Sequence, residues 1–437
     1  MEKYHAKLFK KLSKLLEDKA FINKYTTKEK AFGRNRVLSF KTVTLLILQL
    51  LKSSLKTELK NFYTTIFRKD EVVNWVSASA LCQARQKIKY LLFIDLYKLI
   101  NRYFYRHIGG KRWFHFRLLA VDGSEINLPS SKELLRDYGC HHTNSIGTQI
   151  PQARISYLCD VKNYLTIDAQ IESFKVGEQT MFEAHLRDIG KNDLLTADAN
   201  YGHFRIFKLI LSNGADYCIR MSVCSNFVKD FLKSGKQDAV LTWIPSCKTK
   251  QNCQKHGIDI EPIKVRLVRI DLSAGITEVL AVSLTDQQKY SYQKIKELYD
   301  ERWGAEEEIK KYLQRLMLEF FSSLKTNGIL QDFYANVFVL NLVGFIADPV
   351  HDQVDKDSAS QKRKHKHQIN WASAIGDVKR RTVLLFLRSL EKIKLIIESI
   401  QKSFRLNTEA VRKGRKFPRD KRKKGARKKA FIQYKPI

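Results

Sequence analysis

The residues between positions 299 and 311 have the types and spacing of a site that acts on phosphate groups. The stretch lacks proline and is rich in Glu, Lys, Arg and Ala, which favour a helix. At 100° per residue, three side chains fall within about 40° of Glu306 on one helix face: Tyr299, Arg302 and Lys310. A carboxylate flanked by two cations and a tyrosine can hold a metal ion beside a phosphodiester. The alternative is a solvated helix with i, i+4 ion pairs, which is the common case.

The charge balance of the chain indicates a polyanionic partner. The 437 residues include 79 Lys and Arg against 45 Asp and Glu, giving a formal net charge of +34. Nucleic acid is the first candidate, because neutralising phosphates releases counterions, and an acidic membrane surface is the second. Hydrophobic residues make up 44% of the chain, which excludes general disorder.

Targeting and cysteine patterns are those of a cytosolic protein. No apolar run reaches the roughly 18 residues that a membrane-spanning helix needs, and the N-terminus lacks the apolar segment of a signal peptide. The seven cysteines show no paired spacing, which argues against a disulfide framework. Cys247, Cys253 and His256 match no standard zinc site. We therefore expect a cytoplasmic protein that does not enter the membrane.

The elements that must position an acidic site follow an α/β pattern. Residues 116–122 form a short apolar run that ends at Asp122, and residues 193–198 form a second that ends at Asp198. Residues 154–172 alternate like a hairpin, and residues 204–211 read as a helix. We expect strands at 240–244, 263–272 and 276–284, single helices at 78–99 and 378–404, and a loop at 351–368. A sheet covered by helices follows from this alternation.

Three acids in a basic α/β chain suggest two-metal phosphoryl transfer. Two Mg²⁺ or Mn²⁺ ions about 3.5–4 Å apart would activate the attacking oxygen and stabilise the leaving one. Asp and Glu supply the oxygen ligands that such cations prefer. No P-loop, GxGxxG, GxSxG or HExxH pattern competes for the site. Each acid also has a structural alternative, since Asp122 can be a turn residue and Asp198 a helix cap.

Several sequence blocks, in order, resemble the DDE transposases of bacterial insertion sequences, in particular the group with a Tyr-Arg-Glu-Lys signature. The blocks are LSF at 38–40, SASALCQARQK at 77–87, VDGSEINLP at 121–129, TADANY at 196–201, LYDERWGAE at 298–306, LEFFS at 318–322 and QDFYA at 331–335. Each block alone is weak evidence, but their order and spacing together are specific.

The resemblance implies an α/β fold with a ribonuclease-H-like catalytic core and a β-strand insertion between the second Asp and the Glu. Asp122, Asp198 and Glu306 would then bind two divalent metal ions. Tyr299, Arg302 and Lys310 would contact DNA phosphates, and Trp303 would stack on a flipped base; a tryptophan on a helix is more often partly buried core. The family hydrolyses DNA at element ends, and the freed 3′-hydroxyl then attacks a second strand, often through a hairpin intermediate.

The residue patterns and the resemblance together give the expected domains: a helical DNA-binding region at 1–110, the first part of the core at 111–221, the β-rich insertion at 222–290, completion of the core at 291–350, a helical region at 351–411 and a basic tail at 412–437. The tail carries thirteen Lys and Arg against one acid. The expected partners are double-stranded DNA and a second copy of the chain.

Two positions depart from the family pattern. Leu313 stands where the family usually has a lysine seven residues after the Glu, and the Arg expected after Asp198 is absent. A decayed copy, a DNA-binding protein without catalysis and a ribonuclease-H-like nuclease without strand transfer therefore stay open as alternatives.

Overall fold

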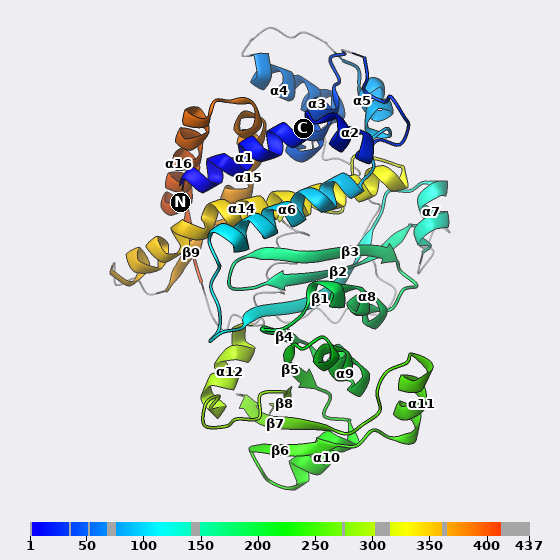
Figure 1. Cartoon of the computed structure of the whole chain (residues 1–437), viewed down its shortest axis with the longest axis vertical. Coiled ribbons are helices and arrows are strands. Elements are labelled where there is room, and N and C mark those ends of the chain that lie inside the picture. Colours follow the sequence, from blue (N-terminus) through cyan, green and yellow to red (C-terminus); the bar gives the residue numbers. More distant parts are fainter. Residues whose placement is uncertain are drawn as a thin grey trace.

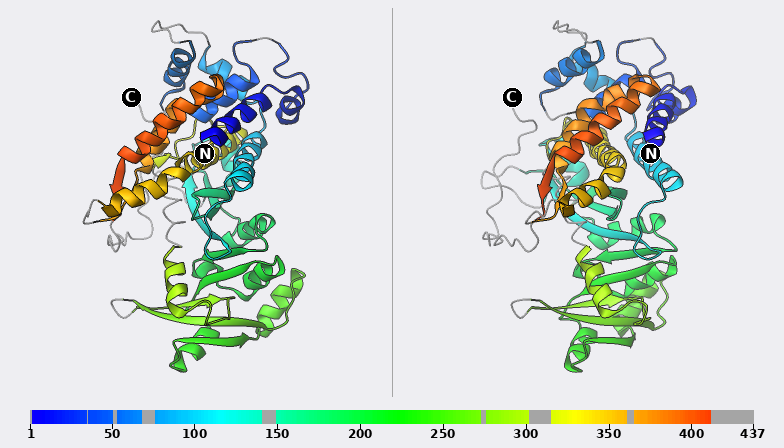
Figure 2. Two further views of the ribbon diagram at one scale, coloured as in Figure 1. Left: turned by 60° about the vertical axis from the view of Figure 1, so that its left-hand side comes forward. Right: turned by 90° about the vertical axis from the view of Figure 1, so that its left-hand side faces the viewer.

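A computed structural model describes residues 2–34, 36–50, 53–67, 76–140, 149–272, 276–301, 315–360 and 365–411. Its centre is a mixed sheet in the order β3-β2-β1-β4-β5-β8-β7-β6. Helices cover both faces of this sheet, and a second group of helices lies above it (Figures 1 and 2).

The first five strands form the ribonuclease-H-like part of the sheet. They are β1 (Arg117–Asn127), β2 (Gln152–Asp160), β3 (Leu165–Ser173), β4 (Asp193–Ala197) and β5 (Asp216–Met221). β1, β2 and β3 pair antiparallel, whereas β4 runs parallel to both β1 and β5. Helix α9 (Phe204–Ser212) supplies the crossover that parallel β4 and β5 require.

The insertion extends this sheet rather than forming a separate one. β6 (Asp238–Trp243), β7 (Ile263–Leu272) and β8 (Ile276–Val282) are antiparallel, and β8 pairs with β5. These strands confirm the three predicted from the sequence. Two helices were not predicted here, α10 (Asn226–Lys233) and α11 (Cys247–Lys255), and both lie at the lower end of the molecule (Figure 1). The chain then enters α12 (Tyr292–Glu301).

Long helices join the sheet to the N-terminal region. α6 (Leu91–His107) and α14 (Thr326–Ser360) cross above the sheet (Figure 1), and their apolar side chains share one core with β2 and β3. The remaining N-terminal helices are α1 (Glu2–Leu15), α2 (Lys19–Tyr25), α3 (Phe40–Gln49), α4 (Leu55–Phe67) and α5 (Ala78–Arg85). Among the described helices, α14 alone is apolar and long enough to cross a membrane, but 94% of its most apolar window is buried inside the protein.

The sheet is flanked by shorter elements, and the C-terminal helices pack beside α1. The flanking elements are α7 (Lys132–Tyr138), α8 (Glu178–His185), η1 (Leu186–Asp188) and η2 (Ala199–Tyr201). The C-terminal elements are β9 (His367–Ile369), α15 (Trp371–Leu387), α16 (Leu390–Leu406) and β10 (Thr408–Ala410).

Several sequence expectations were wrong in extent. β1 does not end at Asp122 but continues to Asn127, because its second half still pairs with β2. The helix expected over 78–99 is divided between α5 and α6, and the one over 378–404 is divided where the Ser389 side chain caps α16. The loop expected at 351–368 is largely the last turns of α14.

Candidate active site

Asp122 lies within β1, two residues beyond the last residue that pairs with β4. The parallel register pairs Leu119 with Leu195 and Ala120 with Thr196. Two residues further along both segments, the same register places Asp122 level with Asp198. Neighbouring strands run about 4.8 Å apart. Two carboxylates at the same level of adjacent strands are close enough to share a metal ion.

Asp198 follows β4 directly and keeps an extended backbone, with φ −80° and ψ −179°. Its carboxylate accepts the backbone N–H of Asn200 at 2.9 Å, which caps the short helix η2. Gly202 ends this turn, and a β-carbon there would come within 2.8 Å of the Arg220 carbonyl oxygen. The turn that presents Asp198 therefore requires glycine at that position.

The row of polar residues continues onto β5. Ala197 pairs with Ile219, which places Arg220 beside Asp198. The core under α12 contains one earlier residue from each of these strands: Leu118, Leu194 and Cys218. Leu118 and Leu194 lie four positions before Asp122 and Asp198, and Cys218 lies two positions before Arg220. Because strand side chains alternate, Asp122, Asp198 and Arg220 project from that same face. The three residues form one polar row across three strands.

The charges of Asp122 and Asp198 both act on the buried hydroxyl of Tyr201. Burial raises the pKa of Tyr201, and the negative charges of Glu178, Asp122 and Asp198 raise it further. Three acids thus act on one buried hydroxyl, so negative charge gathers around Tyr201.

Among the described residues, Arg220 is the cation of this row. Burial lowers the pKa of Arg220, but its hydrogen bond to Glu278 and the nearby Tyr299 and Asp198 groups raise it overall. Its guanidinium pairs with the Glu278 carboxylate at 2.8 Å.

Tyr299 sits on α12 above the row. Its side chain is only 4% exposed and packs with Ile295 and Leu298 of the same helix. Arg302, Trp303, Glu306, Lys310 and Leu313 lie outside the described residues.

The two ends of the segment that carries Glu306 are nevertheless fixed. Glu301, at the end of α12, pairs with Lys162 at 2.8 Å. Lys162 follows the end of β2, which lies next to the start of β1. Downstream, Glu319 accepts the backbone N–H of Asn127, the last residue of β1, at 2.9 Å. Glu301 and Glu319 therefore lie near opposite ends of β1, the strand that carries Asp122 between those ends.

Sequence patterns missed two charged residues next to this site. An arginine in a strand reads as a solvent-facing side chain, so only the strand register identifies Arg220. Glu178, at the start of α8, accepts the side-chain amide of Asn200 at 2.6 Å and so holds the η2 turn. Its position directly after Gly177, at the start of a helix, gave no usable signal.

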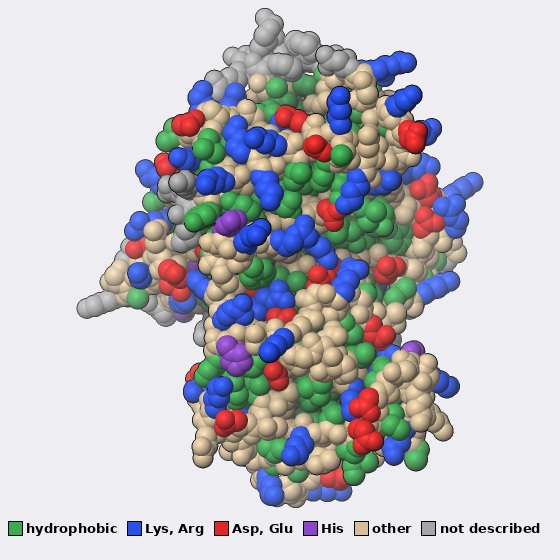
Figure 3. Space-filling view, in the orientation of Figure 1, with side chains coloured by type: hydrophobic (Ala, Val, Ile, Leu, Met, Phe, Trp, Pro, Cys, Tyr) green, Lys and Arg blue, Asp and Glu red, His purple; other side chains and the backbone are tan. Residues whose placement is uncertain are grey.

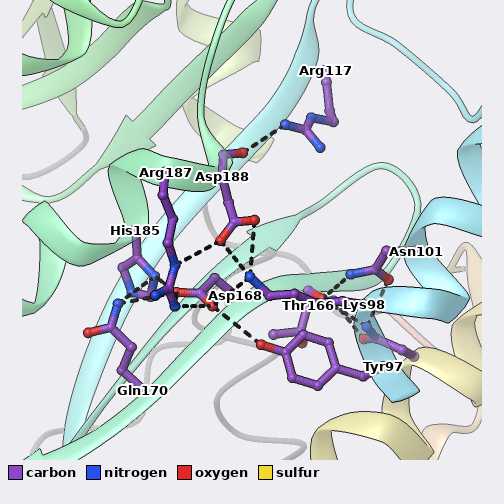
Figure 4. A network of polar contacts seen from close by, with 11 residues as sticks. Tyr97, Lys98, Asn101, Arg117, Thr166, Asp168, Gln170, His185, Arg187 and Asp188 are labelled. Carbon is purple, nitrogen blue, oxygen red and sulfur yellow. Dashed lines mark hydrogen bonds and ion pairs between the residues drawn. The ribbon is translucent and has the colours of Figure 1, made fainter. Parts of the chain in front are cut away.

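A second cluster contains the side-chain types of a nucleophilic triad, but these side chains are not exposed to solvent (Figure 4). His185 contacts the Ser156 hydroxyl at 2.9 Å and the Asp168 carboxylate at 2.8 Å. All three side chains are fully buried beneath α8. Lys98 and Arg187 also pair with Asp168. No substrate can reach Ser156, so this cluster stabilises the sheet.

At this site, the described residues offer two ligands for a metal ion. Among the parts of the chain that the structure describes, no three His, Cys, Asp or Glu residues lie close enough to hold a metal ion. Asp122 and Asp198 are the pair with the right oxygen chemistry, and the negative locality around Tyr201 fits a cation. A third ligand would have to come from residues outside those described.

Comparison with known proteins identifies the family. No curated protein matches the chain. A cryo-EM structure of a piggyBac transposase synaptic complex with hairpin DNA aligns with 11% identity and a TM-score of 0.41, over 89% of this chain and 84% of that one. A similarity at that level carries no argument about fold or function. The profile of the transposase DDE domain matches residues 113–342, more than half of the chain. The chain therefore belongs to the transposase DDE domain family.

Proposed function

We propose that this protein is the transposase of a bacterial insertion sequence and that it belongs to the group with the Tyr-Arg-Glu-Lys signature. It binds the ends of its element, cleaves the DNA there and transfers the freed 3′ end, through a hairpin intermediate. It works in the cytoplasm on chromosomal DNA, as a dimer that holds two ends together. The observation that carries the proposal is the level placement of Asp122 and Asp198 on adjacent parallel strands.

In this proposal Asp122, Asp198 and Glu306 hold two Mg²⁺ or Mn²⁺ ions. Bound metal would supply charge neutralisation at the scissile phosphate and a more acidic attacking water. The fit rests on the oxygen donor set and on the negative locality at Tyr201. The placement of Glu301 and Glu319 near opposite ends of β1 supports Glu306 as the third ligand, because it anchors both flanks of that segment beside the strand that carries Asp122.

The chain's own groups position the DNA around these carboxylates. Arg220 lies next to Asp198 and offers a guanidinium to a phosphate oxygen, with Glu278 holding it in place. Arg302 and Lys310 would add two further cations, and Trp303 would stack on the base that leaves the helix. Tyr299, expected from the sequence to contact the same phosphates, has a side chain only 4% exposed and would instead act on them through the neighbouring Arg220.

The test is cleavage of duplexes that carry the terminal repeats flanking the gene, with Mg²⁺ and with EDTA. The wild-type protein should nick at the repeat end only with metal. Asp122→Asn and Asp198→Asn should each lower the rate by roughly 10³-fold or more, as expected when charge stabilisation is lost. Asp271→Asn, on the exposed turn side of β7, is the matched control and should cleave normally. Equal cleavage by Asp198→Asn and wild type would refute the proposed site.

A separate readout measures the metal itself. Mn²⁺ should raise the melting temperature of the wild-type protein, because a ligand that binds only the folded state stabilises it. The same addition should have no such effect on the Asp122→Asn/Asp198→Asn double variant. An equal increase in both proteins would place the metal elsewhere.

A further inference from the structure

One face of α1 carries a row of lysines far from the proposed active site. The row repeats at i, i+3, i+4 and i+7 and consists of Lys7, Lys10, Lys11 and Lys14. The opposite face of α1 is fully buried through Leu8, Phe9 and Leu12. Since helix residues at that spacing share one side, the four ammonium groups form a single stripe.

The lysine stripe borders a groove between α1 and the start of α16. The groove has a volume of about 470 Å³ and is lined by the four lysines together with Leu15, Asp18 and Leu390. In the orientation of Figure 3, Lys and Arg side chains spread across the upper half of the molecule, where α1 lies. The stripe is therefore a concave basic surface and not a set of isolated side chains.

Two of the acidic residues near the stripe, Glu17 and Asp18, have partners outside it. Glu17 pairs with Lys41 at 2.7 Å, and Asp18 caps α2 by accepting the backbone N–H of Phe21 at 2.8 Å. None of the four stripe lysines forms an ion pair with a residue that the structure describes. Like charges four residues apart repel each other. The stripe thus holds a charge excess that an external anion would offset.

The positive surface extends from α1 onto α16. The charges of Lys10 and Lys394 both act on Glu391, the second residue of α16. Lys10 and Lys394 consequently lie on the same side of the molecule, and a single acid stands between them.

The dimensions of the stripe fit an extended polyanion. Seven residues of helix span about 10 Å. A DNA duplex presents about six phosphate charges over that length of its axis. A membrane surface fits less well, because the apolar residues of α1 face the core and leave no apolar face for a bilayer.

We propose that the lysine stripe of α1 and its groove bind the phosphate backbone of duplex DNA, apart from the carboxylates that cleave it. This deepens the proposed function, on which it rests, by naming a surface for the DNA. α1 packs against α6, α15 and α16 and not against the strands that carry Asp122 and Asp198. The stripe therefore contributes affinity without sequence preference and without a direct part in cleavage.

The experiment compares two quadruple variants of the full chain. The first replaces Lys7, Lys10, Lys11 and Lys14 by Gln. The control replaces four exposed lysines at the other end of the molecule, on and next to α10 and α11, and so removes the same charge: Lys229, Lys233, Lys236 and Lys248. Dissociation constants are measured over a range of salt concentrations with a terminal-repeat duplex and with an unrelated duplex of equal length.

The stripe variant should show a salt dependence (log K against log salt) shallower by about one unit for each lost phosphate contact, and equally weaker binding to both duplexes. The control should match wild type. Equal losses in the two variants would show that net charge alone matters and would overturn the proposal. So would a stripe variant that binds DNA normally but binds less to vesicles of anionic lipid.

Cleavage measured at saturating DNA separates this inference from the proposed function. The stripe variant should keep the wild-type rate at saturation, because its loss is in affinity. A wild-type protein that binds through the stripe but never cleaves would refute the catalytic proposal and leave the stripe intact.

Discussion

Arg85 and Asp332 form an ion pair at 2.8 Å, although 247 positions separate them in the chain. Both side chains are almost completely buried, and Arg85 also donates to Gln331 at 2.9 Å and to Ser322 at 2.6 Å. The pair joins the last residue of α5 to the first turns of α14. Asp332 also accepts the backbone N–H of Ser322 at 2.6 Å and so holds the irregular segment that precedes α14. The ion pair thus fixes the N-terminal helices to the downstream end of the proposed active site.

Breaking the Arg85–Asp332 pair should destabilise the protein strongly. Arg85→Met leaves the Asp332 carboxylate buried without its cation, and the free energy of unfolding should fall by about 3–5 kcal/mol. Denaturant unfolding followed by circular dichroism measures this. The Arg85→Met/Asp332→Leu double variant should recover part of the loss, because no unpaired charge is then buried. Arg405→Met, which breaks an exposed pair with Asp357, should change stability little.

Gly344 in α14 should not tolerate a methyl group. A β-carbon at Gly344 would overlap the carbonyl oxygen of Tyr164, which lies in the turn between β2 and β3. Because that atom belongs to the backbone, it cannot move aside easily, and Gly344→Ala should cost about 1–3 kcal/mol.

Gly376→Ala, in α15, is the control for Gly344→Ala. A β-carbon there meets only the flexible guanidinium of Arg380, at 3.4 Å. The substitution should raise stability by up to about 1 kcal/mol through helix propensity. Equal melting temperatures for the two variants would show that α14 does not pack as described.

The sequence indicated Asp122 and Asp198 because each follows a buried apolar run, and parallel strands bring such positions to the same level. It did not indicate that β1 continues past Asp122, because the polar residues from Gly123 to Glu125 resemble a turn. Their strand conformation depends on pairing with β2, which is a tertiary contact.

Long-range pairings account for most of what the sequence left open. The blocks containing Arg85 and Asp332 were both noticed as part of the family resemblance, but nothing in either block indicates that the two side chains meet. Arg220 is similar, since its place beside Asp198 follows from the β4–β5 register and not from any motif. The insertion strands were predicted correctly because alternation is a local pattern, whereas their addition to the central sheet is not.

The buried Asp168 should make stability depend on acidic pH. Burial alone would raise the pKa of Asp168, but its hydrogen bond with His185 and the charges of His185, Lys98 and Arg187 lower it overall. A carboxyl whose pKa is lowered by folding stabilises the protein above its ordinary pKa near 4. That contribution is lost as the pH falls from about 4 toward the folded-state pKa.

Asp168→Asn should therefore be less stable than wild type at pH 7, by roughly 3 kcal/mol, and should lose less further stability as the pH falls below about 4. Urea unfolding at a series of pH values measures both effects. Asp230→Asn removes an exposed carboxylate of α10 and should follow the wild-type curve. Parallel curves for Asp168→Asn and wild type would show that Asp168 is not the acid responsible.

Arg220 should matter for DNA cleavage and not only for the fold. Arg220→Met removes the guanidinium beside Asp198, and loss of one charged hydrogen bond to a phosphate lowers the cleavage rate by about 10–100-fold. Arg269→Met is the matched control, because the Arg220 and Arg269 side chains are both 33% exposed and each pairs with an acid. Glu278→Gln keeps the Arg220 cation and should retain cleavage within a few-fold. Single-turnover cleavage of terminal-repeat DNA, with melting temperatures as a check on folding, distinguishes the three variants. If Arg220→Met and Arg269→Met cleave equally well, the polar row across β1, β4 and β5 ends at Asp198 and Arg220 serves only the sheet.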